Sequence, residues 1–363
     1  MRWHTIRKMA SILIYSLGSI AGALILVLTF WQPALWAEQR LTDIRMAFFS
    51  PTFPSRDKIV IVGISEEELS KYPYRSPVSR QLLADLLSQT ASKGAKAIGI
   101  DFLFDQPTDP DKDSQLSNAI RQVRIPLVAS YSSTLTGVQK TYVDNFVPAS
   151  DLGNVDILVD PVAGAVRWTY PKVRLQDGKE SFSFAGLLAH KTGVNVPSGK
   201  VAIMWNSNEP AFPQIPVDLV RFLPPNFLRS KIVLIGLMTS DHAHVTPLSV
   251  MGGGPRVPDV EVQAEALATL LGNAASPDIS HWSFIVMSML GGITGCFVAS
   301  FFVESVWARA AYLFSAVIFF YILGFFAWYE YQIMLPIALP VLCLLLAGFT
   351  FNPLRQSIKA HVR

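Results

Sequence analysis

The chain has 363 residues, of which 51% are hydrophobic and 16% charged, and its formal net charge is +3. This composition is too apolar for an ordinary water-soluble domain, while the charged stretch over residues 32–280 excludes a protein made only of membrane spans. The basic excess lies at the two ends beside apolar segments, which argues against nucleic-acid binding.

The N-terminal segment is predicted to anchor the chain in a membrane. Three basic residues precede an uncharged run over residues 9–31, which is longer than the apolar part of a signal peptide. We therefore expect residues 1–31 to form a cytoplasmic tip and an uncleaved transmembrane helix. Gly18 and Gly22 share one face of that helix, where they either permit close helix packing or occur by chance.

Residues 32–57 are predicted to form a stalk helix followed by a linker. Apolar positions recur along the segment as far as Phe49, and Pro51 and Pro54 then end the helical pattern. We expect the stalk to continue outward from the anchor.

A folded α/β domain is predicted over residues 58–280. Short β-branched runs predict buried strands, and stretches with helical spacing of apolar residues predict helices between them. The strands are expected at residues 59–64, the first half of 97–107, 126–131, 201–205 and 232–237, and the helices at 65–68, 79–92, 113–123, 182–191 and 260–271. A hairpin is expected at residues 155–170. The alternation predicts a mostly parallel central sheet flanked by helices.

Three more transmembrane helices are predicted within residues 281–351, at about 282–303, 308–328 and 333–351. Pro336 and Pro340 are expected to bend the last of them. Both cysteines of the chain fall within these spans, so the α/β domain must fold without disulfides. A short tail, residues 352–363, is expected to follow.

Basic residues at both termini, with four spans between them, predict the orientation of the chain. Both ends are expected in the cytoplasm, with residues 32–280 on the periplasmic side of a bacterial inner membrane. Gly291, Gly295 and Ala299 form a stripe of small residues on the second span. Such a stripe either joins two copies of the chain in a homodimer or packs the spans of one chain.

Charged side chains gather where the predicted strands end. Glu66 and Glu67 follow the first strand, Asp101 lies within the second, and Asp241 follows the last. Parallel sheets bind ligands at the carboxyl ends of their strands, so these residues predict a polar pocket, with Arg80 as a counter-charge. The alternative is that Asp101 and Arg80 only satisfy loop amides and helix ends.

The sequence contains none of the common catalytic or nucleotide-binding motifs that we sought, neither a phosphate-binding loop nor a nucleophile elbow nor HExxH. Asp241-His-Ala-His244 could contribute metal ligands, but a loop with this pattern is more often simply exposed to solvent. We therefore expect no enzyme activity, no catalytic residues, no cofactor and no metal site.

The order and spacing of several motifs resemble the CHASE2 sensors of bacterial signalling receptors. These motifs are Asp43-Ile-Arg45, IVIVGI at 59–64 followed by Glu66-Glu67, IGIDFLFDQP at 98–107, DPVAGAVR at 160–167, SFSFA at 181–185, KIVLIG at 231–236, TPL at 246–248 and VEVQA at 260–264. The resemblance implies an extracytoplasmic sensor that feeds a cyclase, histidine kinase or Ser/Thr kinase, with an unidentified ligand.

The chain also departs from the pattern of that family. The family commonly has Asp at Ser65, a Trp-Pro-Trp element at residues 76–78 and Gly at Asp259. The pocket chemistry near the first strand is therefore expected to differ. Only about twelve residues follow the last predicted span, so the output module is expected to be missing or to be a separate protein.

These observations favour a membrane-anchored periplasmic sensor that passes an unknown signal through its transmembrane helices to a separate or missing output module. The alternative is a structural or scaffold membrane protein whose ectodomain binds a protein partner. An enzyme acting outside the membrane is the third class considered, but the spacing of the candidate Ser, His and Asp residues orients no catalytic set.

Overall fold

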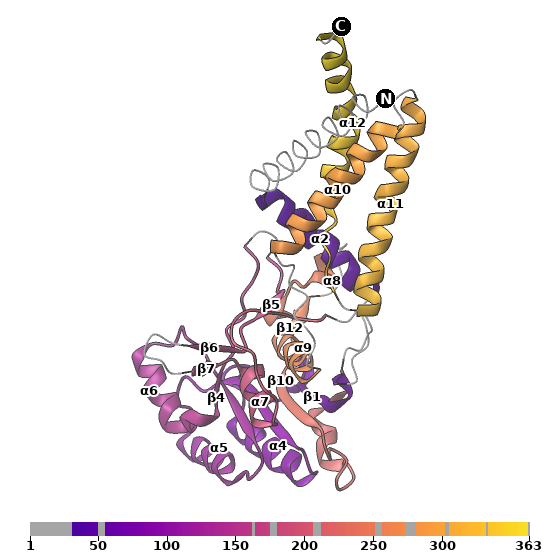
Figure 1. Ribbon diagram of the computed structural model, residues 1–363. Coiled ribbons are helices and arrows are strands. Elements are labelled where there is room, and N and C mark those ends of the chain that lie inside the picture. Colours follow the sequence, from indigo (N-terminus) through magenta and orange to yellow (C-terminus); the bar gives the residue numbers. More distant parts are fainter. Residues whose placement is uncertain are drawn as a thin grey trace. The chain divides into compact units, whose positions relative to one another are not determined.

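The computed structural model divides into two compact units, one of residues 46–276 and one of residues 1–45 and 277–363 (Figure 1). It describes residues 31–49, 55–161, 164–174, 180–205, 212–250, 256–272, 281–301, 305–331 and 333–361. The predicted first transmembrane helix, with Gly18 and Gly22, lies outside the described residues.

The first unit is built on a six-stranded sheet in which every pair of neighbouring strands is parallel. Its spatial order is β4-β3-β2-β10-β1-β9. The strands are β1 (Ile59–Ile64), β2 (Ala97–Leu103), β3 (Leu127–Tyr131), β4 (Leu152–Asn154), β9 (Gln214–Pro216) and β10 (Ile232–Leu237). The predicted α/β class with a mostly parallel sheet is thereby confirmed.

The two most similar apolar runs of the sequence are the two central strands. β1 pairs with β10 along its whole length, with Ile61 opposite Leu234, and both strands are almost fully buried. β10 also pairs with β2. Consecutive strands β1 and β2 are therefore separated by a strand that lies far away in the sequence.

Helices cover both faces of the sheet (Figure 1). Side chains of α4 and α5 pack with Ile98 and Ile100 of β2, whereas α7 and α9 lie against the opposite face. Gly99 faces α7 so closely that an added Cβ would lie 2.7 Å from Phe184. The helices of this unit are α3 (Glu66–Leu69), α4 (Arg80–Ser92), α5 (Pro110–Gln122), α6 (Gly137–Phe146), α7 (Phe184–Lys191), α8 (Pro247–Val250) and α9 (Asp259–Leu271).

The predicted hairpin at residues 155–170 is wrong. A tight turn forms, in which the Gly164 amide donates to the Asp160 carbonyl (2.7 Å), but the residues beside it do not pair as two strands. In the second arm, Trp168 and Thr169 pair with β8 (Val201–Ala202) instead, and Ala165 forms an isolated bridge with Val245. Three small antiparallel sheets lie outside the main one. These join β5 (Trp168–Thr169) to β8, β6 (Lys172–Arg174) to β7 (Glu180–Phe182) and β11 (Ala243–His244) to β12 (Val257–Pro258).

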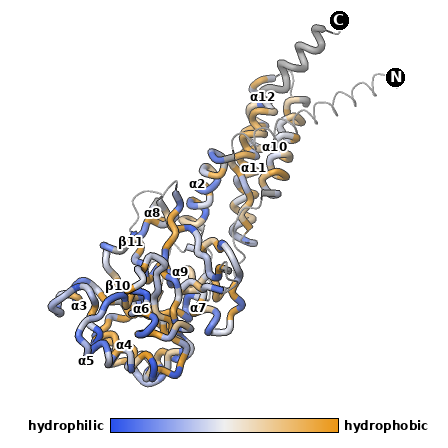
Figure 2. Tube along the Cα trace, turned by 90° about the vertical axis from the view of Figure 1, so that its left-hand side faces the viewer, coloured by the Kyte–Doolittle hydropathy of each residue, from blue (hydrophilic) through white to orange (hydrophobic). Residues whose placement is uncertain are grey.

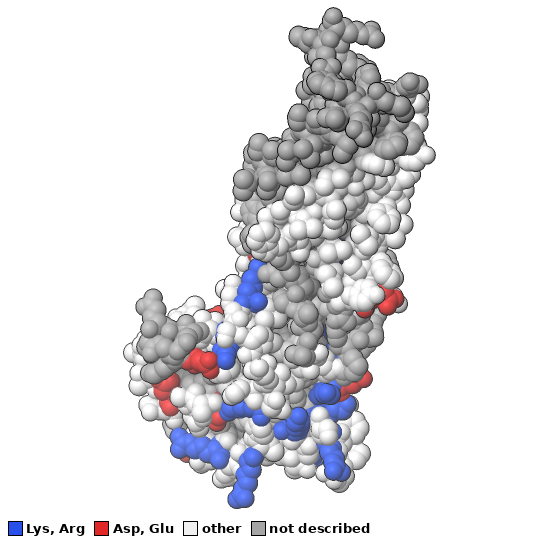
Figure 3. Space-filling model, in the orientation of Figure 1, with Lys and Arg blue, Asp and Glu red and all other residues white. Residues whose placement is uncertain are grey.

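Four helices are described in the second unit, namely α2 (Trp31–Phe49), α10 (His281–Phe301), α11 (Val306–Tyr331) and α12 (Ala338–His361). Only residues 31–45 of α2 belong to this unit. Among the described residues, α10 and α11 are long and apolar enough to cross a membrane, whereas the apolar part of α12 spans only Ala338–Phe349. Figure 2 shows that α10 and α11 consist largely of hydrophobic residues. In Figure 3 few charged side chains lie on the described surface of these two helices. The structure therefore supports membrane anchoring through two spans.

The last predicted span begins later than expected. Pro336 lies before α12, and Pro340 lies in its first turn, where a proline has no intrahelical hydrogen bond to break. The expectation that these prolines bend a span is therefore wrong.

Small residues on α10 permit close contact with α12 in the same chain. A Cβ added at Gly291 would collide with the Pro340 carbonyl, and one added at Gly295 with the Leu344 carbonyl. Ala299 is almost fully buried. The sequence left two roles open for this stripe, joining two copies of the chain or packing the spans of one chain. In the structure the stripe packs two helices of one chain.

A buried ion pair connects α2 with the start of α12. Glu38 pairs with Arg45, and its other carboxylate oxygen accepts hydrogen bonds from the amides of Ile337 (2.7 Å) and Ala338 (2.9 Å). Arg45 also donates to the Leu335 carbonyl (2.9 Å). A carboxylate at a helix N-terminus satisfies free amides and interacts favourably with the helix dipole. The arginine of the Asp43-Ile-Arg45 motif thus helps to fix the beginning of α12.

Candidate functional site

The carboxyl ends of β1, β2, β3 and β10 open into a cavity of about 490 Å³, called the strand-end cavity below. It lies where parallel α/β sheets commonly bind ligands. Five acidic and two basic side chains line it, namely Glu66, Asp101, Asp105, Asp241, Asp259, Arg75 and Arg80. Four of the five residues that the sequence suggested for a pocket are therefore brought together here.

Asp101 is the fifth residue of β2 and is partly buried. Its Oδ1 lies 3.0 Å from the hydroxyl of Ser130, which also lies 3.2 Å from the Ile100 carbonyl. Burial, and after it the neighbouring charge of Asp259, raises the pKa of Asp101 to about 7, against the opposing hydrogen bond from Ser130. The cavity thus contains a carboxyl group whose charge changes near neutral pH.

Protonation of Asp101 also completes the hydrogen bonding around Ser130. One hydroxyl hydrogen cannot be donated to both Asp101 and Ile100. A protonated Asp101 donates to Ser130 Oγ, which leaves the Ser130 hydroxyl free to donate to the Ile100 carbonyl. The local geometry therefore favours the neutral form of Asp101 in the absence of a positively charged neighbour.

Arg80 begins α4 and is buried, but it is already occupied by protein groups. Its Nε lies 3.3 Å from Asp113, and its Nη2 donates to the Gln106 carbonyl at 3.2 Å. The guanidinium also lies over the rings of Phe104 (4.8 Å) and Phe146 (5.8 Å). These contacts fix Arg80 in the cavity wall, with Asp113 as its counter-charge.

Of the three remaining residues predicted for the pocket, two line the strand-end cavity and one does not. Glu66 lines the cavity and pairs with Arg75. Asp241 is exposed at the cavity lining after β10. Glu67 is not part of this site, because it lines a separate hollow of about 420 Å³ that also includes Lys71 and Asp218. Adjacent residues of a helix point in different directions, which explains why Glu66 and Glu67 separate.

A family model described as the CHASE2 domain matches residues 20–301, which is most of the chain. The chain belongs to the CHASE2 family. CHASE2 domains are extracytoplasmic sensor domains, so the α/β unit is a sensor domain by family. No curated protein and no solved structure gives a significant match to the chain.

The sequence did not reveal several residues of this CHASE2 cavity. Asp105, Ser130, Asp259 and Gln263 also line it. Asp259 is the first residue of α9, directly after β12, and it contacts Nε2 of His244 in β11. The only sequence signal for Asp259 is that it replaces the glycine common in the family.

A second CHASE2 motif, DPVAGAVR, forms a buried ion pair rather than part of the strand-end cavity. Arg167 donates to Asp160 at 2.6 Å, and both side chains are almost fully buried. The Asp160 amide donates to the Ala165 carbonyl at 2.8 Å and closes the turn between them. This motif therefore stabilises the loop that precedes β5.

Nothing in the described part of the chain forms a metal site. No group of three or more His, Cys, Asp or Glu residues is arranged there to hold a metal ion. In the Asp241-His-Ala-His244 segment, His244 contacts Asp259, whereas Asp241 lines the strand-end cavity.

Proposed function

We propose that the protein is a membrane-anchored periplasmic sensor whose strand-end cavity binds a small molecule that carries a positive charge. Binding would be passed through the transmembrane helices to a separate output partner such as a cyclase or kinase. In this proposal the chain spans the bacterial inner membrane four times, keeps both termini in the cytoplasm and acts as a homodimer.

The observation that carries the proposal is the unbalanced charge of the strand-end cavity. Both arginines in its lining have acidic partners, Arg75 in Glu66 and Arg80 in Asp113. Asp101 and Asp241 have no cationic partner among the described residues, and the partner of Asp259 is His244 rather than a lysine or arginine. Carboxylates at the end of a parallel sheet, enclosed on several sides, suit an ammonium or similar cation.

The contact between α2 and α12 supports the signalling part of the proposal. The α2 helix precedes the sensor domain in the sequence, and Glu38 and Arg45 attach it to the first residues of α12. A displacement of α2 would break these buried bonds unless α12 followed it. Removing one partner of a buried ion pair typically costs about 3–5 kcal/mol, which makes the joint movement of both helices the easier outcome.

A thermal-shift titration of the full chain in lipid nanodiscs tests ligand binding. The probe is 1,4-diaminobutane, with succinate as an anion of the same carbon number. At a hundred times Kd, binding contributes about 2.7 kcal/mol, which raises Tm by roughly 5–10 °C for a unit of this size. The shift should be larger at pH 8 than at pH 6, because Asp101 ionises near pH 7.

Variants show whether the cation occupies the strand-end cavity. The double variant Asp101→Asn, Asp259→Asn should lose the diamine shift. Asp85→Asn, which removes an exposed carboxylate from α4 outside the cavity, should keep it. An equal shift with succinate, or an undiminished shift in the double variant, would contradict the proposed site.

A further inference from the structure

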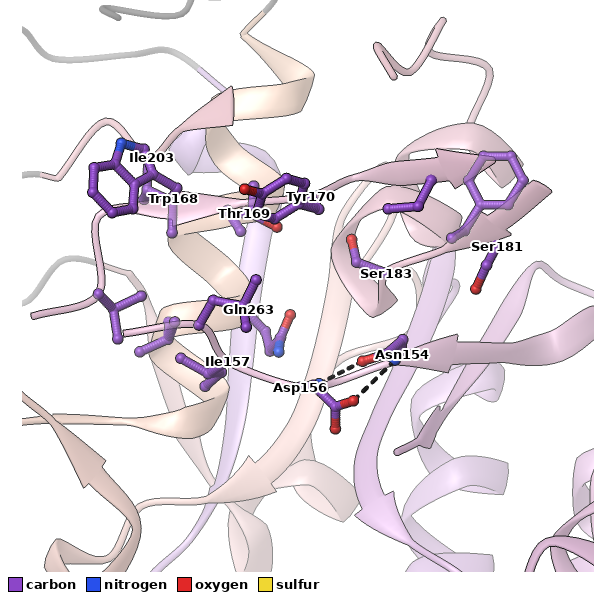
Figure 4. Close-up of a pocket in the computed structure, with 16 residues that line it drawn as sticks. Asn154, Asp156, Ile157, Trp168, Thr169, Tyr170, Ser181, Ser183, Ile203 and Gln263 are labelled. Atoms are coloured by element: carbon purple, nitrogen blue, oxygen red, sulfur yellow. Dashed lines mark hydrogen bonds between the residues drawn. The ribbon is translucent and has the colours of Figure 1, made fainter. Parts of the chain in front are cut away.

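A second cavity lies beside the strand-end cavity in the α/β unit (Figure 4). It has a volume of about 380 Å³, within the range of small-molecule sites. Its walls come from the segment after β4, the two small sheets β5–β8 and β6–β7, and one side of α9. We call it the aromatic cavity, because Trp168, Tyr170 and Phe182 line it.

Two of the three aromatic side chains are held by contacts with other residues. Lys200 Nζ lies 3.7 Å from the centre of the Trp168 ring, and the Phe182 ring stacks on His190 at 5.0 Å. Val173 and Leu158 add apolar surface that is partly exposed. A fixed aromatic wall favours a flat ligand, because little side-chain entropy is lost on binding.

Charge plays little part in this cavity. No lysine or arginine of the described residues lines it, and Asp156 is its one acidic lining residue. In Figure 4 the Asp156 carboxylate points away from the aromatic side chains. Ser132, Ser133 and Asn154 donate hydrogen bonds to it, and these bonds outweigh the effect of burial and lower its pKa. The carboxylate of Asp156 is therefore ionised but already occupied by protein donors, and it is directed away from the aromatic side chains.

Gln263 supplies a polar group that lacks a full set of partners. The residue is 6% exposed and lies on α9, and it lines both cavities. Its Nε2 lies 3.4 Å from the Val155 carbonyl, and its Oε1 has no hydrogen-bond partner in the part of the chain that the structure describes. Figure 4 shows the amide pointing into the aromatic cavity. Gln263 Oε1 is accessible from the cavity, so it can accept a hydrogen bond from a ligand donor there.

We propose that the aromatic cavity is a second binding site, for a neutral, flat aromatic molecule whose one hydrogen-bond donor is accepted by Gln263. The size of the cavity, its aromatic lining and the absence of a charged group that is not already hydrogen-bonded by the protein define the body of the ligand, and the Gln263 amide defines its polar edge. This site is distinct from the cation site in the strand-end cavity and would give the sensor a second class of ligand.

Calorimetric titration of the full chain in nanodiscs tests the proposal, with indole as the probe and heats from empty nanodiscs subtracted. Indene has nearly the same shape as indole but no N–H donor. Indole should bind saturably and about 2- to 10-fold more tightly than indene, as one neutral hydrogen bond allows. In Gln263→Leu this preference should disappear.

Two further variants separate the cavity from the rest of the molecule. Val173→Trp fills the cavity from its partly exposed side, so it should weaken indole binding at least tenfold without a loss of Tm. Asp241→Asn, in the strand-end cavity only, should leave indole binding unchanged. Absence of saturable binding, unchanged binding in Val173→Trp, or an indole preference that persists in Gln263→Leu would overturn the proposal. Because these titrations contain no diamine, their outcome is independent of the cation site.

Discussion

Replacing Asp101 with asparagine should change the pH dependence of stability in a defined direction. The pKa of Asp101 is raised from 3.8 to about 7 in the folded state. The folded protein therefore binds one more proton than the unfolded chain between these values, so stability falls as pH rises from about 4 to 7. A shift of about three pKa units corresponds to about 4 kcal/mol.

Asparagine resembles the protonated form of Asp101. Its amide donates to Ser130 Oγ, and the Ser130 hydroxyl then donates to the Ile100 carbonyl, as in the neutral acid. Asp101→Asn should therefore be nearly as stable as the wild type at low pH and more stable at high pH. Between pH 5 and pH 8 the difference should grow by about 3 kcal/mol, or roughly 10 °C in Tm for a unit of this size.

Thermal unfolding of the full chain in detergent, followed by circular dichroism at half-unit pH steps, measures this difference. Asp241→Asn is the matched control, because it removes an exposed carboxylate from the same cavity. Comparison with the wild type at each pH cancels the contribution of all other titrating groups. A difference between Asp101→Asn and wild type that stays constant from pH 5 to pH 8 would refute the reasoning.

Two other substitutions test the packing of the two units. Arg56→Met breaks a buried ion pair in which Arg56 Nη1 lies 2.6 Å from Glu265. In urea unfolding it should lower the free energy of unfolding by about 3–5 kcal/mol, whereas the control Asp85→Asn should lower it by less than about 0.5 kcal/mol. Gly291→Leu should force α10 away from α12, so a disulfide between cysteines introduced on these two helices should form less readily. Leu290→Ala, on the exposed side of α10, should leave the disulfide yield unchanged. Equal disulfide yields in the two variants would contradict the contact between α10 and α12.

Local patterns in the sequence were sufficient for much of the α/β unit. The β-branched runs became β1, β2, β3 and β10, since a strand buried on both faces needs continuous apolar residues. Helix boundaries followed caps such as Ser79 and Ser183, whose side chains accept backbone amides. Asp101 was identifiable because a carboxylate inside such a strand requires a special environment.

Sequence spacing could not show which distant segments become neighbours. The position of β10 between β1 and β2, the approach of Asp259 to Asp101 and the separation of Glu67 from Glu66 all depend on how complete elements pack. The aromatic cavity joins residues from β5, β7 and α9, which are far apart in the chain. Periodicity reports only the burial of a residue within its own element, whereas a site depends on contacts between elements, which form only when the whole core is packed.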